Sequence, residues 1–123
     1  MAKLVEMDER VGIFAQMAEN VGPIILINKF SVGPEDFDEF LKAWATEAEK
    51  FKQQPGFIST QLHRGIGGSG TFVNYAVWES AALFKRAVNT VMNPQDRMSA
   101  YPASTVASPH LFKKVAVPGI CVE

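Results

Sequence analysis

The stretch that decides the fold is residues 71–80, which read TFVNYAVWES. Residues 71–79 are rich in β-branched and aromatic side chains, and they predict a strand. Because successive side chains of a strand point to opposite faces, Asn74 and Trp78 share one face and Tyr75 lies on the other. Apolar side chains occur on both faces, so both must be covered.

A second strand of this kind is predicted over 24–32, which begins IILI. Between the two strands, Pro34 and the acidic residues after it favour the start of a helix. Apolar residues at steps of three and four form one stripe on this helix: Phe37, Phe40, Leu41, Trp44, Ala48 and Phe51. We expect four charged residues to lie largely off the stripe: Lys42, Glu47, Glu49 and Lys50.

The remaining elements complete a β-α-β-β-α-β order. Residues 57–64 predict a strand, residues 65–70 (GIGGSG) a hairpin loop, and Ser80 the cap of a second helix that runs to Val91. Residues 111–117 predict the last strand. This order is that of an α+β, ferredoxin-like fold with an antiparallel four-stranded sheet.

Residues 1–22 predict an N-terminal helical arm, because their apolar positions fall at helical spacing before Gly22 and Pro23. We therefore divide the chain into this arm and one domain over 23–123. Two helices can cover only one face of a sheet. A second copy of the chain is the economical cover for the other face, which predicts a homodimer, and the alternative is that the arm folds over its own sheet.

Residues 55–59 (PGFIS) and 74–80 (NYAVWES) resemble the antibiotic biosynthesis monooxygenase family. The resemblance implies a dimeric α+β barrel and, for the quinone-forming members, oxidation of polycyclic aromatics with molecular oxygen. Several of those members use no metal, flavin or nicotinamide. We accordingly expect a small aromatic substrate, O2 and no cofactor.

Asn74 is the oddity of its strand, since an amide between apolar neighbours must be paired or face a ligand. The residues alone leave a second interpretation open, in which Trp78 is a core residue and the Asn74 amide is paired with the backbone. The resemblance implies that both meet the substrate, with Arg97 or Arg86 supplying a cation, so that Asn74, Trp78 and Arg97 are the candidate catalytic residues. The candidate substrate-binding residues are Asn28, Phe40, Trp44, Leu62 and Phe84, and Leu62 and Phe84 stand where the quinone-forming members have tyrosines.

Composition excludes several other classes. Twelve basic and thirteen acidic residues give a net charge of -1, so neither nucleic acid nor a membrane surface is an expected partner. Acidic residues interrupt the N-terminal segment before it could act as a signal or a span, which predicts a cytoplasmic protein. One cysteine, Cys121, and two distant histidines, His63 and His110, make no metal-ligand spacing.

Two alternatives to the monooxygenase remain. Haem-degrading relatives share the fold and carry an asparagine on the first strand, which Asn28 matches. Their helix tryptophan and iron-ligating histidine fall, by spacing from Trp78, at Ala87 and Arg97, which disfavours haem. The other alternative is a non-catalytic dimer of the same fold that binds a small molecule.

Overall fold

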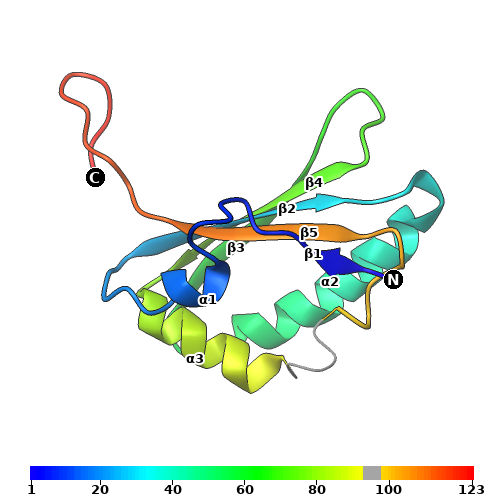
Figure 1. The fold of residues 1–123 in the computed structure, drawn as a ribbon, viewed down its shortest axis with the longest axis horizontal. Coiled ribbons are helices and arrows are strands. Elements are labelled where there is room, and N and C mark those ends of the chain that lie inside the picture. The colour runs from blue at the N-terminus through cyan, green and yellow to red at the C-terminus, as the bar shows by residue number, and fades with distance from the viewer. Residues whose placement is uncertain (93–97) are drawn as a thin grey trace.

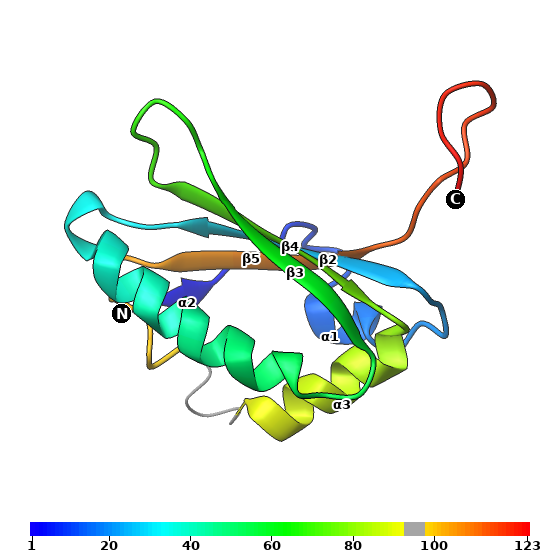
Figure 2. The same ribbon diagram turned by 180° about the vertical axis from the view of Figure 1, so that it is seen from behind.

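The computed structural model describes residues 1–92 and 98–123. In these residues five strands form one sheet in the order β1-β5-β2-β4-β3, and α2 and α3 both lie on one side of it (Figures 1 and 2). The strands are β1 (Lys3–Leu4), β2 (Ile24–Ser31), β3 (Phe57–Arg64), β4 (Thr71–Trp78) and β5 (Val106–Phe112). The helices are α1 (Ile13–Gln16), the 3-10 turn η1 (Pro34–Asp36), α2 (Phe37–Lys52) and α3 (Ala81–Val91).

The β2-α2-β3-β4-α3-β5 order confirms the predicted ferredoxin-like α+β fold. Adjacent strands are antiparallel except β1 and β5, which are parallel. The prediction of four strands was wrong by one, because β1 adds a fifth at the sheet edge. A two-residue strand is too short to produce a periodic pattern, so only its pairing with β5 reveals it.

The last strand was also placed wrongly, because it covers Val106–Phe112 rather than 111–117. Pro109 lies inside this strand, and a proline weakens the sequence pattern of a strand. Its missing N–H faces the β1 side of β5, where the pairing with β1 stops at Ala107. Two residues on, Leu111 N–H points to the same side and donates to Gln16 Oε1 at 2.7 Å. The proline therefore removes no ladder hydrogen bond.

The N-terminal segment differs from the expected helical arm. It contains β1 and then the four-residue helix α1, whose first N–H, that of Ile13, donates to Glu6 Oε1 at 2.9 Å. Ile13 and Met17 are buried in the same core cluster as Trp78. The segment therefore packs on the side of the sheet that α2 and α3 cover.

Local predictions around the second helix were confirmed. The Ser80 hydroxyl accepts a hydrogen bond from Leu83 N–H at 3.1 Å, as expected of a helix cap. The glycine-rich residues 65–70 join two antiparallel strands, with Gly67 and Gly68 at positive φ. Gly65, Gly67 and Gly70 have the G-x-G-x-x-G spacing of a dinucleotide-binding motif. Because strand β4 and not a helix follows the loop, the structural context of that motif is missing.

The core between sheet and helices is divided into two clusters. One surrounds Trp78 and includes Leu26 and Phe84, and the other contains Phe30, Phe40, Phe72 and Tyr101. On β4 the residue between the two clusters is Asn74, and on β2 it is Asn28. The division of the core thus falls where both strands carry an amide.

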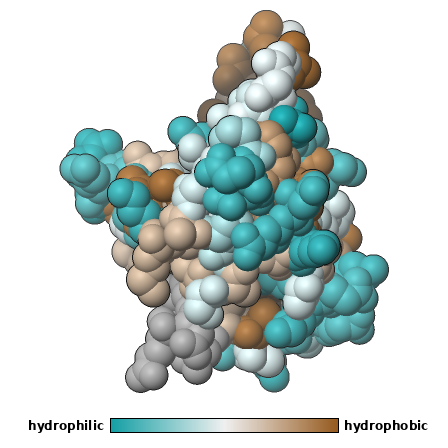
Figure 3. All heavy atoms as spheres, turned by 90° about the vertical axis from the view of Figure 1, so that its right-hand side faces the viewer, coloured by the Kyte–Doolittle hydropathy of each residue, from teal (hydrophilic) through white to brown (hydrophobic). Residues whose placement is uncertain are grey.

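The C-terminal residues leave the body of the molecule as an extended arm (Figure 1). Hydrophobic atoms gather on the projecting end of the molecule (Figure 3), and exposed apolar residues of the arm and of the β3–β4 loop include Ile66, Val115, Val117, Ile120 and Val122. In the described part of the chain, no helix has the length and apolarity needed to cross a membrane.

Candidate functional site

A row of polar side chains crosses the sheet on its helix-covered face. Asn28 and Asn74 are partners in the register of β2 and β4, and Thr60 on β3 is the partner of Ala76, two residues beyond Asn74. Side chains of one strand alternate between faces. Asn28, Asn74 and Thr60 therefore point to the same side, and we call them the polar row.

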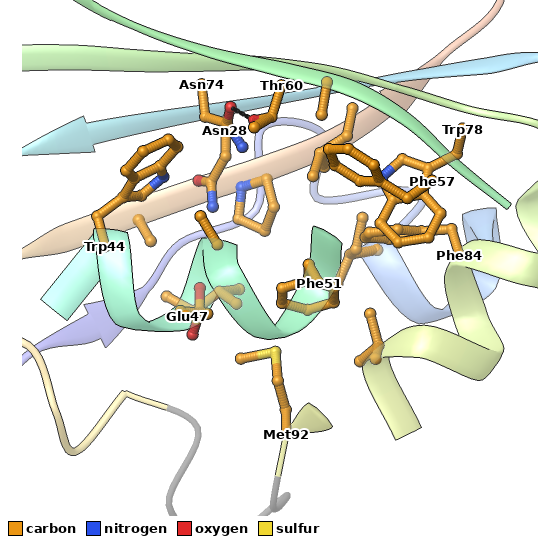
Figure 4. A pocket seen from close by; sticks show the side chains of 18 of the residues that line it. Asn28, Trp44, Glu47, Phe51, Phe57, Thr60, Asn74, Trp78, Phe84 and Met92 are labelled. Atoms are coloured by element: carbon orange, nitrogen blue, oxygen red, sulfur yellow. Dashed lines mark hydrogen bonds between the residues drawn. The ribbon is translucent and has the colours of Figure 1, made fainter. Parts of the chain in front are cut away.

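The polar row borders a cavity between the sheet and the helices (Figure 4). The empty space, including the part open to solvent, is about 840 Å³. Apolar and aromatic side chains make most of the wall, among them Ile13, Met17, Leu26, Phe30, Trp44, Phe51, Phe57, Ala76, Trp78, Phe84, Val88 and Met92. Such a space suits a flat, largely apolar molecule that carries a few oxygen atoms.

A hydrogen bond within the row fixes the orientation of one amide. Thr60 Oγ1 donates to Asn74 Oδ1 at 2.5 Å. Because the carbonyl oxygen of the amide is held by Thr60, its NH2 group is the part left to meet a ligand. Figure 4 shows Asn74 and Thr60 joined above the cavity, with the Asn28 amide directed into it. Asn74 is thus oriented as a donor.

The side chain of Asn28 supplies a hydrogen-bond acceptor in the polar row. Its Oδ1 is buried and has no hydrogen-bond partner among the described residues. A buried, unpaired acceptor costs about 1–3 kcal/mol in stability. A bound ligand that donates a hydrogen bond to Asn28 would remove this cost, and the row as a whole therefore offers both a donor and an acceptor.

Glu47 on α2 is the one carboxylate in the described wall of the cavity. Its Oε1 accepts a hydrogen bond of 3.0 Å from the hydroxyl of Tyr101. Burial raises the pKa of the Glu47 carboxyl, while the Tyr101 hydrogen bond and the Lys50 charge oppose the shift. Burial and the nearby Glu47 charge raise the pKa of Tyr101, so its hydroxyl keeps its proton.

Trp78 forms an aromatic wall at the end of the cavity near α3. Its side chain is 2% exposed and meets three phenylalanines edge to face: Phe51, Phe57 and Phe84, with ring centroids at 6.0, 5.5 and 5.4 Å. Such contacts restrict the indole to one orientation. Trp78 is therefore both a core residue and part of the cavity wall.

Residues 23–93 match the model of the antibiotic biosynthesis monooxygenase family. The chain belongs to this family. Deoxynogalonate monooxygenase from Streptomyces nogalater is 34% identical over 67 residues, which are 53% of this chain and 54% of that protein. The chain thus spans about half the length of this curated relative.

Solved structures agree with the family assignment. The crystal structure of SnoaB, a cofactor-independent oxygenase from Streptomyces nogalater, has a TM-score of 0.64 at 26% identity, over 80% of this chain and 99% of that one. A haem-degrading protein from Mycobacterium tuberculosis, solved without haem, has a TM-score of 0.57 at 26% identity, over 79% and 96%. The relatives of this chain thus include both monooxygenases and a haem-degrading protein.

The structure brings five of the eight residues named from the sequence together in the cavity: Asn28, Trp44, Asn74, Trp78 and Phe84. Phe40 and Leu62 do not line it. Phe40 is 0% exposed and packs on Phe30 and Phe72, with ring centroids 4.9 Å away in both cases. Arg97 lies outside the described residues, and Arg86 is exposed on α3.

Sequence analysis missed Thr60 and misplaced Glu47. Thr60 gave no signal, because a threonine is ordinary in a strand and only the register of β3 brings it to Asn74. Glu47 was expected largely off the apolar stripe of its helix. It follows Trp44 by three residues and precedes Phe51 by four, which is the spacing of the stripe itself. A carboxylate at such a spacing was the available signal.

Both histidines point away from the cavity of this family member. His63 and His110 lie on the opposite face of the sheet, where their ring nitrogens meet the carbonyl oxygens of Val73 and Leu111 at 3.2 and 2.7 Å. In the described residues, no group of three histidine, cysteine or acidic side chains could hold a metal ion. The described wall of the cavity therefore supplies no histidine for a haem iron.

Proposed function

We propose that this chain is a cofactor-independent monooxygenase that oxidises an electron-rich aromatic or enolisable compound with O2 and forms a quinone. The observation that carries the proposal is the polar row, with an oriented donor and an unpaired acceptor, in an otherwise apolar cavity. Similarity to SnoaB and to deoxynogalonate monooxygenase supports the reaction class.

The reaction requires no covalent bond between the substrate and the protein. A phenolate or enolate can give one electron to O2, and the resulting superoxide and carbon radical combine to a peroxide. Loss of water from the peroxide leaves the quinone carbonyl. Asn74 would donate to the oxyanion through its NH2 group, Trp78 would offer its indole N–H, and the apolar walls would shelter the radical pair from water. Arg97 is retained as a candidate for offsetting the charge.

We further propose that the active species is a homodimer. The face of the sheet away from the helices carries apolar side chains from three strands: Ile25, Ile27, Val73, Tyr75, Val77 and Phe112. Tyr75 and Phe112 are 40% and 38% exposed in the single chain. A second copy of the same face would cover them. We place the dimer in the cytoplasm, where the exposed, free Cys121 would stay reduced.

An oxygen electrode tests the catalytic proposal. A panel of dihydroxynaphthalenes and quinols should give protein-dependent oxygen uptake, with equimolar quinone detected by absorbance and no loss of rate after treatment with a chelator. Asn89→Ala, an exposed asparagine on α3, serves as the control for Asn74→Ala. Tight binding of these compounds without oxygen uptake would reject the enzyme and favour a non-catalytic binding dimer.

A hemin titration tests the haem alternative. Because both histidines lie on the other face of the sheet, we expect no Soret shift of the kind produced by specific iron ligation. Stoichiometric haem binding that is lost on changing His63 or His110 would overturn this expectation.

A further inference from the structure

The cavity holds a carboxylate, although the proposed reaction would favour a cation there. Its described wall contains Glu47 and no arginine or lysine. A negative charge beside a developing oxyanion would oppose the reaction. A carboxylate in this place is better suited to remove the proton that creates the anion.

Glu47 is held in position by a partner outside the cavity wall. The Tyr101 hydroxyl bonds to Oε1, and the Tyr101 ring is fixed against Phe30 and Phe40 with centroids at 5.9 and 5.7 Å. Within the described residues, no hydrogen bond reaches the other oxygen, Oε2. One oxygen thus anchors the group and the other remains for a ligand.

The sheet side of the cavity, opposite Glu47, is suited to bind a hydroxyl group. Asn28 Oδ1 is a buried acceptor without a partner in the described chain, and Figure 4 shows the Asn28 amide directed from the sheet toward the side where α2 carries Glu47. An acceptor on the sheet and a base on α2 both suit a ligand that arrives with its O–H protons in place. A ligand oxygen that had already lost its proton would be repelled by the Glu47 carboxylate and could not donate to Asn28 Oδ1.

We propose that Glu47 is the base of this site, that Tyr101 positions it, and that the substrate binds as a neutral, planar phenol or enol. This inference rests on the proposed monooxygenase function. The substrate O–H bond breaks and an O–H bond forms at Glu47, while the electron pair stays on the substrate oxygen facing the NH2 of Asn74. After electron transfer to O2 and formation of the carbon–oxygen bond, Glu47 returns its proton to the peroxide. Loss of the ring C–H proton and of water then leaves the quinone.

The pH dependence has a definite sign. The titratable and charged groups that act on Glu47 in the described chain are Tyr101, from the loop before β5, and Lys50, on α2 itself. Burial raises the pKa of Glu47 above its ordinary 4.5. Turnover should rise with pH as the carboxyl loses its proton, and it should be lost as the pH falls through that raised pKa.

Glu47→Gln is the decisive variant, because the amide keeps an acceptor for Tyr101 and removes the base. We expect kcat to fall roughly 10²- to 10⁴-fold, the scale of a general base, and the acidic limb of the pH profile to disappear. Glu49→Gln on the same helix is the matched control, since Glu49 is exposed and pairs only loosely with Lys52 at 3.6 Å. Equal turnover of Glu47→Gln and wild type at every pH would overturn the assignment.

The melting temperature of Glu47→Gln distinguishes a catalytic base from a residue that only stabilises the fold. Folding holds Glu47 with a raised pKa, so the folded protein binds the proton more tightly than the unfolded chain does, and stability falls as the pH rises past 4.5. Glu47→Gln should therefore melt above the wild type at neutral pH and level with it below pH 4.5. A loss of both stability and turnover in parallel would indicate a structural residue and contradict the proposal.

Tyr101→Phe tests the positioning residue. The ring contacts remain, but Glu47 loses the hydrogen bond that lowers its pKa, so the acidic limb should move to higher pH while kcat at the plateau falls only a few-fold. An unmoved limb would show that Tyr101 does not act through Glu47.

A colour test without oxygen distinguishes this inference from the proposed function. The probe is 1,2-dihydroxyanthraquinone, whose visible absorption reports its ionisation, mixed anaerobically with the protein below the free pKa of the dye. The wild type should hold the dye as its anion and Glu47→Gln should hold it as the neutral form. A neutral dye on the wild type, or no dye binding, would overturn the role of Glu47. An anionic dye together with no oxygen uptake from any quinol would reject the monooxygenase and leave the base in place.

Discussion

The two faces of the sheet are made by alternate residues of the same strands. One face buries polar side chains, and the other exposes apolar side chains to water. The helix-covered face has a polar row inside an apolar core, with Asn28 Oδ1 unpaired in the described chain. The other face has large apolar side chains in water, with Tyr75 at 40% and Phe112 at 38% exposure. An unpaired polar atom in a cavity indicates a ligand, while exposed apolar side chains over several strands indicate a protein partner.

Among the side chains of the sheet, removing the amide of Asn74 should have the largest effect. Asn74→Ala should lower kcat roughly ten- to a thousandfold, as loss of one oxyanion donor does, with little change in Tm. Turnover and melting temperature are measured on the same preparation, beside Asn89→Ala. Unchanged turnover in well-folded Asn74→Ala would reject its catalytic role.

A charge on the other face should separate the proposed dimer. Tyr75→Lys places two like charges at a symmetric interface, beside the existing Lys29 of the same face, and should raise the dimer Kd by at least about 10²-fold. Light scattering measures the mass, with Ala82→Lys on the exposed side of α3 as the control. A wild-type monomer at micromolar concentration would contradict the dimer itself.

Trp78→Phe sharpens the comparison, since this side chain belongs to both the core and the cavity. Three edge-to-face ring contacts are changed, so the free energy of unfolding should fall by about 1–3 kcal/mol. Loss of the indole N–H should lower turnover by roughly two- to tenfold, less than for Asn74→Ala. If only the melting temperature falls, Trp78 is solely a core residue.

The smallest combined effect on stability and turnover should come from Thr60→Val, which keeps the shape and removes the hydroxyl. The Asn74 amide loses the bond that orients it, and kcat should fall roughly two- to tenfold, as for one neutral hydrogen bond. Thr46→Val is the matched control, because its hydroxyl bonds to Lys42 O on the exposed side of α2. Equal rates for both variants would mean that Asn74 is oriented by other contacts.

The fold was largely readable because its long elements carry strong periodicity. Strands 24–32 and 71–79 were predicted within a residue of their ends, and the helix expected after Pro34 is present as η1 followed by α2. The errors fell where local pattern is weak: β1 has two residues, and β5 contains Pro109. The pairing of β5 with β2 outweighed its poor strand propensity.

Five of the eight site residues named from the sequence line the cavity. Asn74 was conspicuous because an amide is out of place between apolar neighbours, and alternation alone put Trp78 on its face. Phe40 was misjudged because an apolar stripe cannot distinguish a residue that lines a cavity from one that fills the core. Leu62, also named from the sequence, pairs with Asn74 in register but does not line the cavity.

By itself the sequence determined the α+β order of elements, the alternation that separates the two faces of β2 and β4, and the placement of Asn74 with Trp78. The tertiary structure alone decided which polar groups meet: it set Asn28 beside Asn74, brought Thr60 to the amide oxygen, and joined Glu47 to Tyr101, fifty-four residues away in the chain. Periodicity is a local property of neighbouring residues, whereas a site depends on register between strands and on the packing of a helix over them, which local sequence does not specify.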